Sequence, residues 1–121
     1  MPDRSIETEL SKARSILSRV WGYDAFRNGQ EEVLKALFAG QNVLAVMPTG
    51  SGKSICYQLP ALLRDGLTIV ISPLIALMQD QVQQLRALGI EAGSLNSGNA
   101  PGENLRVERA IAERRLRLVY I

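Results

Sequence analysis

The sequence predicts an α/β fold in which helices flank a parallel sheet and a helical segment comes first. Two short runs, NVLAVM (residues 42–47) and LTIVIS (67–72), are almost wholly apolar and rich in Val and Ile. Such runs are typical of parallel strands that are buried on both faces. Segments with helical periodicity precede, separate and follow the two runs. This alternation of strand and helix indicates a parallel sheet.

Two helices are expected before the first apolar run. Residues 5–20 are predicted to form an amphipathic helix, because apolar residues recur there at helical spacing: Ile6, Leu10, Ala13, Leu17 and Val20. A turn-rich connection, WGYDAFRNGQ (21–30), leads to a second helix from Gln30 to Ala39, which Gly40 ends. We therefore expect an N-terminal helix over residues 1–20 and a separate domain from residue 21 onward.

Helices and strands are expected to alternate after residue 47. A helix is predicted from Lys53 to Leu63, and Pro60 should bend or end it. The later elements are a helix over 74–88 closed by Gly89, a strand near 92–95, a loop NSGNAPG (96–102), a helix over 103–115 and a strand RLVYI (117–121). Arginines and glutamates alternate near the end of the chain, which we interpret as a solvated helix face; the arginines are Arg106, Arg109, Arg114, Arg115 and Arg117.

The composition excludes several classes of protein. A length of 121 residues suits one small domain or part of a larger one, and 46% hydrophobic with 21% charged residues indicates a globular chain. There is no His, which excludes His-dependent nucleophilic sites and most zinc sites. The single cysteine, Cys56, and the absence of a signal region or a membrane-length apolar run lead us to expect a cytoplasmic protein.

The stretch PTGSGKS (48–54) predicts a phosphate-binding loop, because it lies between an expected strand and an expected helix. Successive backbone N–H groups of such a loop and of the helix N-terminus form an anion site. Glycines permit the close approach of backbone to phosphate, Lys53 can reach the outer phosphates, and Ser54 can ligate Mg²⁺. The other expected nucleotide-binding residues of the loop are Pro48, Thr49, Gly50, Ser51 and Gly52. The alternative interpretation is a glycine-rich turn with a chance Lys-Ser pair.

Three blocks of sequence, in order and spacing, resemble the RecQ family of DNA helicases. MPTGSGKS (47–54) resembles helicase motif I of that family, in which Met in place of the usual first Gly is common. YDAFRNGQ (23–30) resembles motif 0, and SPLIALMQDQV (72–82) resembles motif Ia. The shorter segments LNS (95–97) and RLVYI (117–121) also look like family segments, so the resemblance runs from about Leu17 to Ile121.

The resemblance implies roles for several residues outside the phosphate loop. Motif 0 contacts adenine in the family, so Tyr23, Arg27 and Gln30 are expected to bind the nucleotide. The carboxamide of Gln30 can pair with both N6 and N7 of adenine. The alternative is that these residues have structural roles, and for Phe26 we expect a core role. Motif Ia lies beside the DNA path, so Ser72 and Pro73 are candidate DNA contacts.

The resemblance further implies a P-loop NTPase fold of the RecA-like kind, with residues 21–121 forming the N-terminal portion of the first helicase domain. Such helicases use ATP and Mg²⁺ to unwind DNA from 3′ to 5′ in repair and recombination, and in bacteria they act in the cytoplasm at the nucleoid. They need an acidic DEAH motif, which does not occur by residue 121. We therefore expect an N-terminal fragment that does not hydrolyse ATP at a useful rate by itself. Zinc-binding regions of the family would lie outside it.

The expected strand over 42–47 also bears on association. In RecA-like domains the phosphate-loop strand is flanked by strands that come later in the chain. Residues 42–47 are therefore expected to lack their partners, which favours strand swapping or association between copies. The oligomeric state itself is not predicted.

Three other functions are consistent with a phosphate loop. A DEAD-box RNA helicase shares an upstream Gln motif, but it typically carries a PTRELA-like sequence where this chain has SPLIALMQDQ. A small-molecule kinase or another nucleotide-binding module would not explain motif 0 and motif Ia together. A fragment that only binds nucleotide is the remaining alternative.

Overall fold

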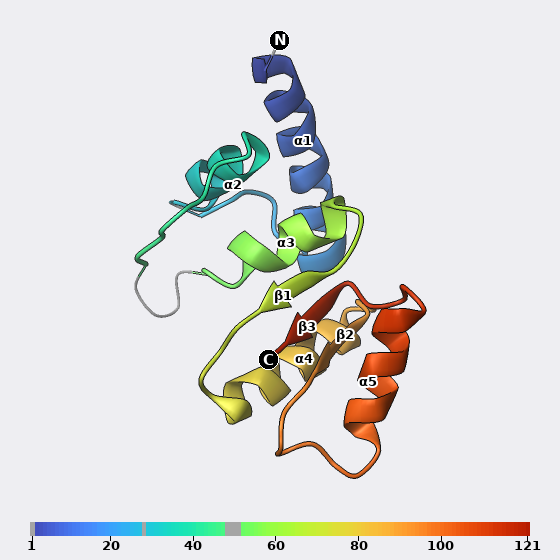
Figure 1. Ribbon diagram of the computed structural model, residues 1–121. Helices are drawn as coiled ribbons and strands as arrows, with labels where there is room; N and C mark the ends of the chain where they lie inside the picture. The colour runs from blue at the N-terminus through green and yellow to red at the C-terminus, as the bar shows by residue number, and fades with distance from the viewer. Residues whose placement is uncertain (1, 28, 48–51) are drawn as a thin grey trace. The chain divides into compact units, whose positions relative to one another are not determined.

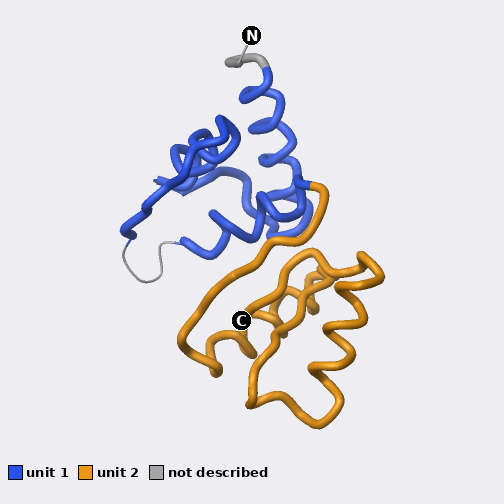
Figure 2. The backbone as a smooth tube through the Cα atoms, in the orientation of Figure 1, with its two compact units in different colours: residues 1–64 blue, residues 65–121 orange. Residues whose placement is uncertain are grey.

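The computed structural model describes residues 2–27, 29–47 and 52–121. The chain divides into two compact units, residues 1–64 and residues 65–121, which Figure 2 shows in different colours. Among the described residues, no helix combines the length and the apolar character needed to cross a membrane.

Unit 1 is helical (Figure 1). Its first helix, α1 (Pro2–Ile16), continues as a π-helical segment, η1 (Leu17–Trp21), and Gly22 ends it in a left-handed conformation with φ +75°. The other helices are α2 (Gln30–Phe38) and α3 (Ile55–Leu63). The expected helices over 5–20 and from Gln30 are thus present. Pro60 does not end α3, which continues to Leu63.

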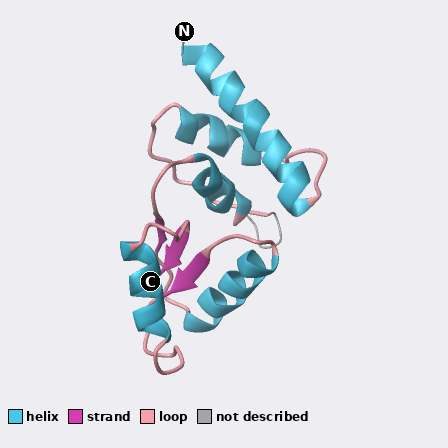
Figure 3. Cartoon of the chain, turned by 90° about the vertical axis from the view of Figure 1, so that its right-hand side faces the viewer, coloured by secondary structure: helices cyan, strands magenta, loops and turns pink. Residues whose placement is uncertain are grey.

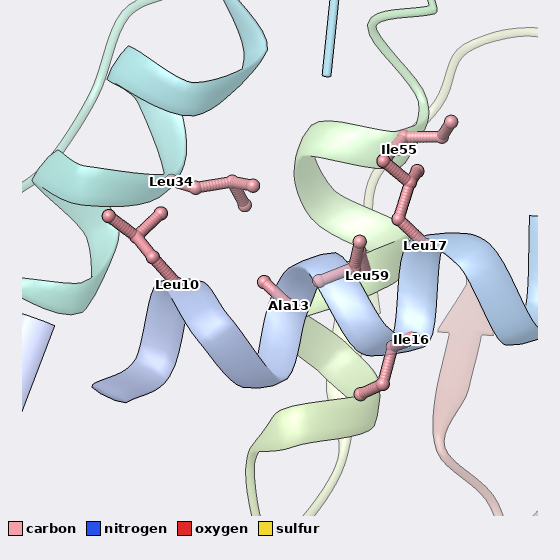
Figure 4. Packing of buried hydrophobic residues seen from close by; sticks show 7 residues of the cluster. All are labelled: Leu10, Ala13, Ile16, Leu17, Leu34, Ile55 and Leu59. Atoms are coloured by element: carbon pink, nitrogen blue, oxygen red, sulfur yellow. The ribbon is translucent and has the colours of Figure 1, made fainter. Parts of the chain in front are cut away.

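The core of unit 1 is formed by the apolar stripe of α1 and η1 against the other two helices. In Figure 4, Leu10 points toward Leu34 of α2, and Leu17 points toward Ile55 of α3. Leu10, Leu34 and Leu59 are completely buried. The spacing of this stripe, read from the sequence alone, therefore corresponds to the face that is buried.

The prediction of a strand over residues 42–47 is wrong for this structure, whereas these residues lack strand partners among the described residues, as expected. These residues are extended but carry no strand pairing, and Leu44 and Val46 are 91% and 90% exposed. Within the described part of unit 1 no strand lies beside them. Because a strand is defined by hydrogen bonds to a neighbouring strand, apolar composition alone does not form one.

Unit 2 contains the sheet. Its elements are β1 (Thr68–Val70), α4 (Ile75–Ala87), β2 (Ala92–Ser94), α5 (Glu103–Ala112) and β3 (Leu118–Tyr120). All three strands are parallel in the order β1-β3-β2, with Leu118 in register with Thr68 on one side and with Ala92 on the other. The expected strands and helices of this region are all present, with somewhat shorter bounds.

Helices α4 and α5 cover opposite faces of this sheet (Figure 3). The chain crosses the sheet in one direction through α4 and returns through α5, and right-handed crossovers in opposite directions put their helices on opposite faces. Val119 packs with Val107 and Ala110 of α5. Gly93 permits this close packing on β2, because a Cβ there would lie 2.9 Å from Cγ2 of Val107.

Candidate nucleotide-binding site

Gln30 connects the segment before α2 with the end of the phosphate loop. It is the first residue of α2 and is only 2% exposed. Its Oε1 accepts a hydrogen bond from the backbone N–H of Arg27 at 2.8 Å, and its Nε2 donates to the carbonyl oxygen of Gly52 at 2.9 Å. One side chain thus joins two segments that are 22 residues apart in sequence.

Gly52 is required at its position for two reasons. Its φ is +78°, a conformation that residues with a Cβ rarely adopt. A Cβ at this position would also lie 2.5 Å from Nε2 of Gln30. The carbonyl of Gly52 accepts from the N–H of Ile55 as well, at 3.2 Å, so the same residue starts the turn into α3.

Lys53 and Ser54 lie at the N-terminus of α3. Ser54 precedes the first residue of the helix and is half-buried, whereas Lys53 is exposed. The N-terminal end of a helix carries partial positive charge and attracts phosphate. An ammonium group and a hydroxyl group at this end fit a nucleotide with Mg²⁺, because they supply a phosphate ligand and a metal ligand. The predicted residues Pro48, Thr49, Gly50 and Ser51 lie outside the described residues.

Tyr23 and Arg27 are neighbours beside this site. The guanidinium carbon of Arg27 lies 5.9 Å from the centroid of the Tyr23 ring, which is the range of a cation–π contact. Tyr23 is 46% exposed, so its ring is available for stacking. Phe26, by contrast, packs against the core of unit 1, as expected. A Cβ added at Gly29 would lie 3.6 Å from Cε of Met47, which puts the methionine beside motif 0.

The structure thus brings Arg27, Gln30 and Gly52 together, with Lys53 next in sequence. The Gln30 carboxamide already has two partners within the chain. A carboxamide has a second lone pair and a second N–H, so adenine recognition by Gln30 is compatible with these bonds. The adenine role of Tyr23, Arg27 and Gln30 stays a prediction.

The two candidate DNA contacts lie at the carboxyl end of β1. Ser72 donates its backbone N–H to the carbonyl of Ile121 at 3.0 Å, and its hydroxyl oxygen accepts from the N–H of Leu74 at 3.3 Å. Pro73 is exposed. Both residues therefore lie where ligands bind open parallel sheets, and their contact with DNA stays a prediction.

An amide network at the same edge of the sheet was missed by the sequence analysis. Nδ2 of Asn99 donates to the carbonyl of Ser94 and to Oδ1 of Asn104, both at 2.7 Å. Nδ2 of Asn104 donates to the carbonyl of Asn96 at 3.1 Å. These bonds shape the loop that follows β2. The signal is three asparagines within nine residues, of which Asn96 and Asn99 lie in the predicted loop and Asn104 lies in the predicted helix over 103–115.

The single cysteine takes no part in this site. Cys56 is buried in α3, and burial raises the pKa of its thiol above the ordinary value of 9.0. A thiol with a raised pKa is a poor nucleophile and a poor metal ligand at neutral pH. Cys56 is therefore a packing residue.

The chain matches the family model of the DEAD/DEAH box helicases over residues 27–120. It belongs to the DEAD/DEAH box helicase family. The match includes Arg27, Gln30, the phosphate loop and every strand of the sheet. The residues around Gln30 and Lys53 thus lie within the part of the chain that matches the DEAD/DEAH box helicase family.

Curated relatives within this helicase family are named as DNA helicases. The chain is 53% identical over 113 residues to the ATP-dependent DNA helicase RecQ of Haemophilus influenzae. The aligned region covers 93% of this chain and 18% of the relative. It is 47% identical over 113 residues to RecQ of Bacillus subtilis, covering 93% of this chain and 19% of the relative. For ATP-dependent DNA helicase Q-like 5 of Arabidopsis thaliana the identity is 38% over 119 residues, covering 97% and 13%.

These matches confirm the resemblance to RecQ helicases that the sequence indicated. The chain spans about a fifth of the length of the bacterial relatives.

Proposed function

We propose that this chain is the N-terminal part of an ATP-dependent DNA helicase similar to RecQ. In the full-length protein it binds ATP with Mg²⁺, and ATP hydrolysis drives unwinding of DNA from 3′ to 5′ in repair and recombination. The observation that carries this proposal is the bond from Gln30 to Gly52, which joins motif 0 to the phosphate loop next to Lys53. The names of the relatives support DNA rather than RNA as the substrate.

Each part of the site has a proposed role. The loop residues Pro48 to Ser51, with Gly52, have the proposed role of phosphate binding, while Lys53 neutralises charge that develops on the outer phosphates. Ser54 would ligate Mg²⁺, which would supply charge neutralisation to the phosphates. Tyr23 stacks on adenine, Arg27 lies beside it, and Gln30 hydrogen-bonds its edge.

Hydrolysis requires more than these residues supply. In phosphoryl transfer the protein contributes mainly positioning and electrostatic stabilisation, shared among the loop, the metal, an acidic motif and an arginine. No DEAH motif occurs in this chain. We therefore propose that the chain by itself binds nucleotide without hydrolysing it at a useful rate.

The unwinding activity of the full-length protein tests this proposal. We expect strand separation of a DNA duplex with a 3′ single-stranded tail, dependent on ATP and Mg²⁺. A duplex with a 5′ tail and an RNA duplex with a 3′ tail are the matched controls, and both should stay intact. Unwinding of the RNA duplex in preference to the DNA duplex would favour the DEAD-box alternative and contradict the proposal.

A further inference from the structure

All cationic side chains of unit 2 line two adjoining cavities. Residues 65–121 contain six arginines, no lysine and six acidic residues, so the unit is neutral as a whole. Every one of the arginines lines one or both cavities: Arg86, Arg106, Arg109, Arg114, Arg115 and Arg117. Three of the six acidic residues, Asp65, Glu91 and Glu103, line the same cavities, so positive side chains outnumber negative ones there; we call this part of the surface the arginine face.

The arginine face lies at the amino ends of the strands. The first cavity, of about 450 Å³, is bounded by Arg86 at the end of α4, by α5, and by Glu91 just before β2. The second, of about 550 Å³, is lined by the residues that precede β1 and β3. The two cavities share Arg115 and Leu116, so they adjoin at this edge of the sheet.

Two glutamates, Glu103 and Glu113, hold part of the arginine face in position without neutralising all of it, and Glu113 pairs with Arg115 at 2.8 Å. Arg86 donates from Nε to the carbonyl of Ala92 at 2.8 Å and pairs with Glu103 at 3.3 Å. Glu103 is also 3.7 Å from Arg106, whose side chain is 79% exposed. Within the part of the chain that the structure describes, the guanidinium of Arg109 has no hydrogen-bond or ion-pair partner. The face thus keeps cationic groups available to a ligand.

The opposite edge of the sheet, at the carboxyl ends of the strands, differs from the arginine face in the charge of its side chains. The candidate DNA contacts there, Ser72 and Pro73, and the asparagine loop after β2 are neutral. In unit 2 they can hold phosphate only through hydroxyl, amide and backbone N–H groups. The arginine face therefore contains the whole capacity of unit 2 to neutralise phosphate charge.

We propose that the arginine face binds the phosphates of DNA, at the edge of the sheet opposite Ser72. Guanidinium groups form paired hydrogen bonds with phosphate oxygens, and the repeated charge of a DNA strand suits six arginines spread over two adjoining cavities better than a single anion does. In the first cavity the side chains beneath the arginines, Val107, Ala110 and Leu116, are buried and offer little apolar surface for a peptide side chain. This inference rests on the proposed function, which supplies DNA as the polyanion.

The salt dependence of DNA binding tests the proposal in the full-length protein. The variant is R106A/R109A, and the matched control is R19A, because Arg19 is exposed in unit 1. For two lost phosphate contacts on a single strand, the slope of log K against log salt falls by roughly 1.4. Binding of a labelled single strand should then weaken about 25-fold at 0.1 M salt and converge with wild type near 1 M salt. R106K/R109K keeps the charge and should keep most of the slope.

Two results would overturn the proposal. One is a slope for R106A/R109A that equals those of R19A and wild type, with equal thermal stability of all variants. The other is binding of labelled poly-glutamate that depends on Arg106 and Arg109 while DNA binding does not, which would assign the face to an acidic polypeptide. DNA-stimulated ATP hydrolysis, measured on the same wild-type preparation, reports separately on the proposed function.

Discussion

Two segments of similar composition behave differently in this chain. NVLAVM (42–47) and LTIVIS (67–72) both consist almost entirely of apolar residues. The second contains β1, which pairs with β3 from Thr68 to Val70. The first has no strand partner within the described residues of its unit, and two of its side chains are about nine-tenths exposed.

The difference shows what turns an apolar run into a strand. Both segments have the composition that favours strands, but among the described residues only the second has a neighbour in its own unit to take its backbone hydrogen bonds. That neighbour, β3, comes near the end of the chain and pairs on both sides. Strand formation at 67–72 therefore depends on residues about fifty positions later in the sequence.

The largest effect on stability is expected from a substitution that removes buried side-chain contacts of β3, the strand that pairs with both β1 and β2. Leu118 is completely buried and lies at the start of the central strand. Leu118→Ala should lower the free energy of unfolding by about 2–5 kcal/mol, because it leaves a cavity in the core. Urea denaturation, followed by circular dichroism, measures this loss. A loss below about 1 kcal/mol would mean that unit 2 does not depend on this strand.

A smaller effect, on ATP binding, is expected from substitution of Gln30. Residues 42–47 lead into the phosphate loop, and Gln30 forms a hydrogen bond to Gly52 at the other end of that loop. Gln30→Ala removes the bond to Gly52 and the expected adenine contacts, so ATP binding by the full-length protein should weaken by about 1–3 kcal/mol. The preference for ATP over GTP should fall as well. Fluorescent-nucleotide titration measures both, with Gln41→Ala as the control. If wild type binds ATP and GTP with equal affinity, and Gln30→Ala leaves this unchanged, base recognition by Gln30 is excluded.

A pH effect should appear at Cys56, a buried residue of the same unit as the exposed segment 42–47. Its folded-state pKa is raised by burial above 9.0, so the neutral thiol is favoured in the folded chain. The stability that this contributes is present below pH 9.0 and is lost as pH rises through the folded pKa. Urea midpoints from pH 8 to 10.5 should fall less for Cys56→Ala than for wild type. Identical falls would show that the thiol does not titrate abnormally.

The smallest effect is expected at the unpaired segment itself. Leu44 is 91% exposed, so Leu44→Ala should change the stability of the 121-residue chain by no more than about 0.5 kcal/mol. The same urea experiment as for Leu118 measures it. A loss of stability comparable to that of Leu118→Ala would contradict the difference between segments 42–47 and 67–72, because it would show that residues 42–47 are packed in solution.

The sequence predicted best what depends on local pattern. The helices of both units and the strands of unit 2 follow from periodicity, from apolar runs, and from glycines such as Gly40 and Gly89. The prediction of a strand at 42–47 was wrong because strand pairing depends on residues that are distant in the sequence. The bond between Gln30 and Gly52 could not be predicted because it joins segments that meet only in the folded unit. The sequence predicted only a solvated helix face for the arginines from Arg106 to Arg117, since residue spacing does not show that Arg86 of α4 lines the same cavity as the arginines of α5.

Lys53 provides the most direct test of the account, because the proposed activity depends on a phosphate site at the N-terminus of α3. ATP hydrolysis by the full-length protein should be measured with and without single-stranded DNA, for wild type and Lys53→Ala. We predict that DNA stimulates hydrolysis by wild type, and that Lys53→Ala abolishes this hydrolysis while DNA affinity and thermal stability stay close to wild type. Normal DNA-stimulated hydrolysis by Lys53→Ala, or no ATP hydrolysis by wild type, would contradict the account.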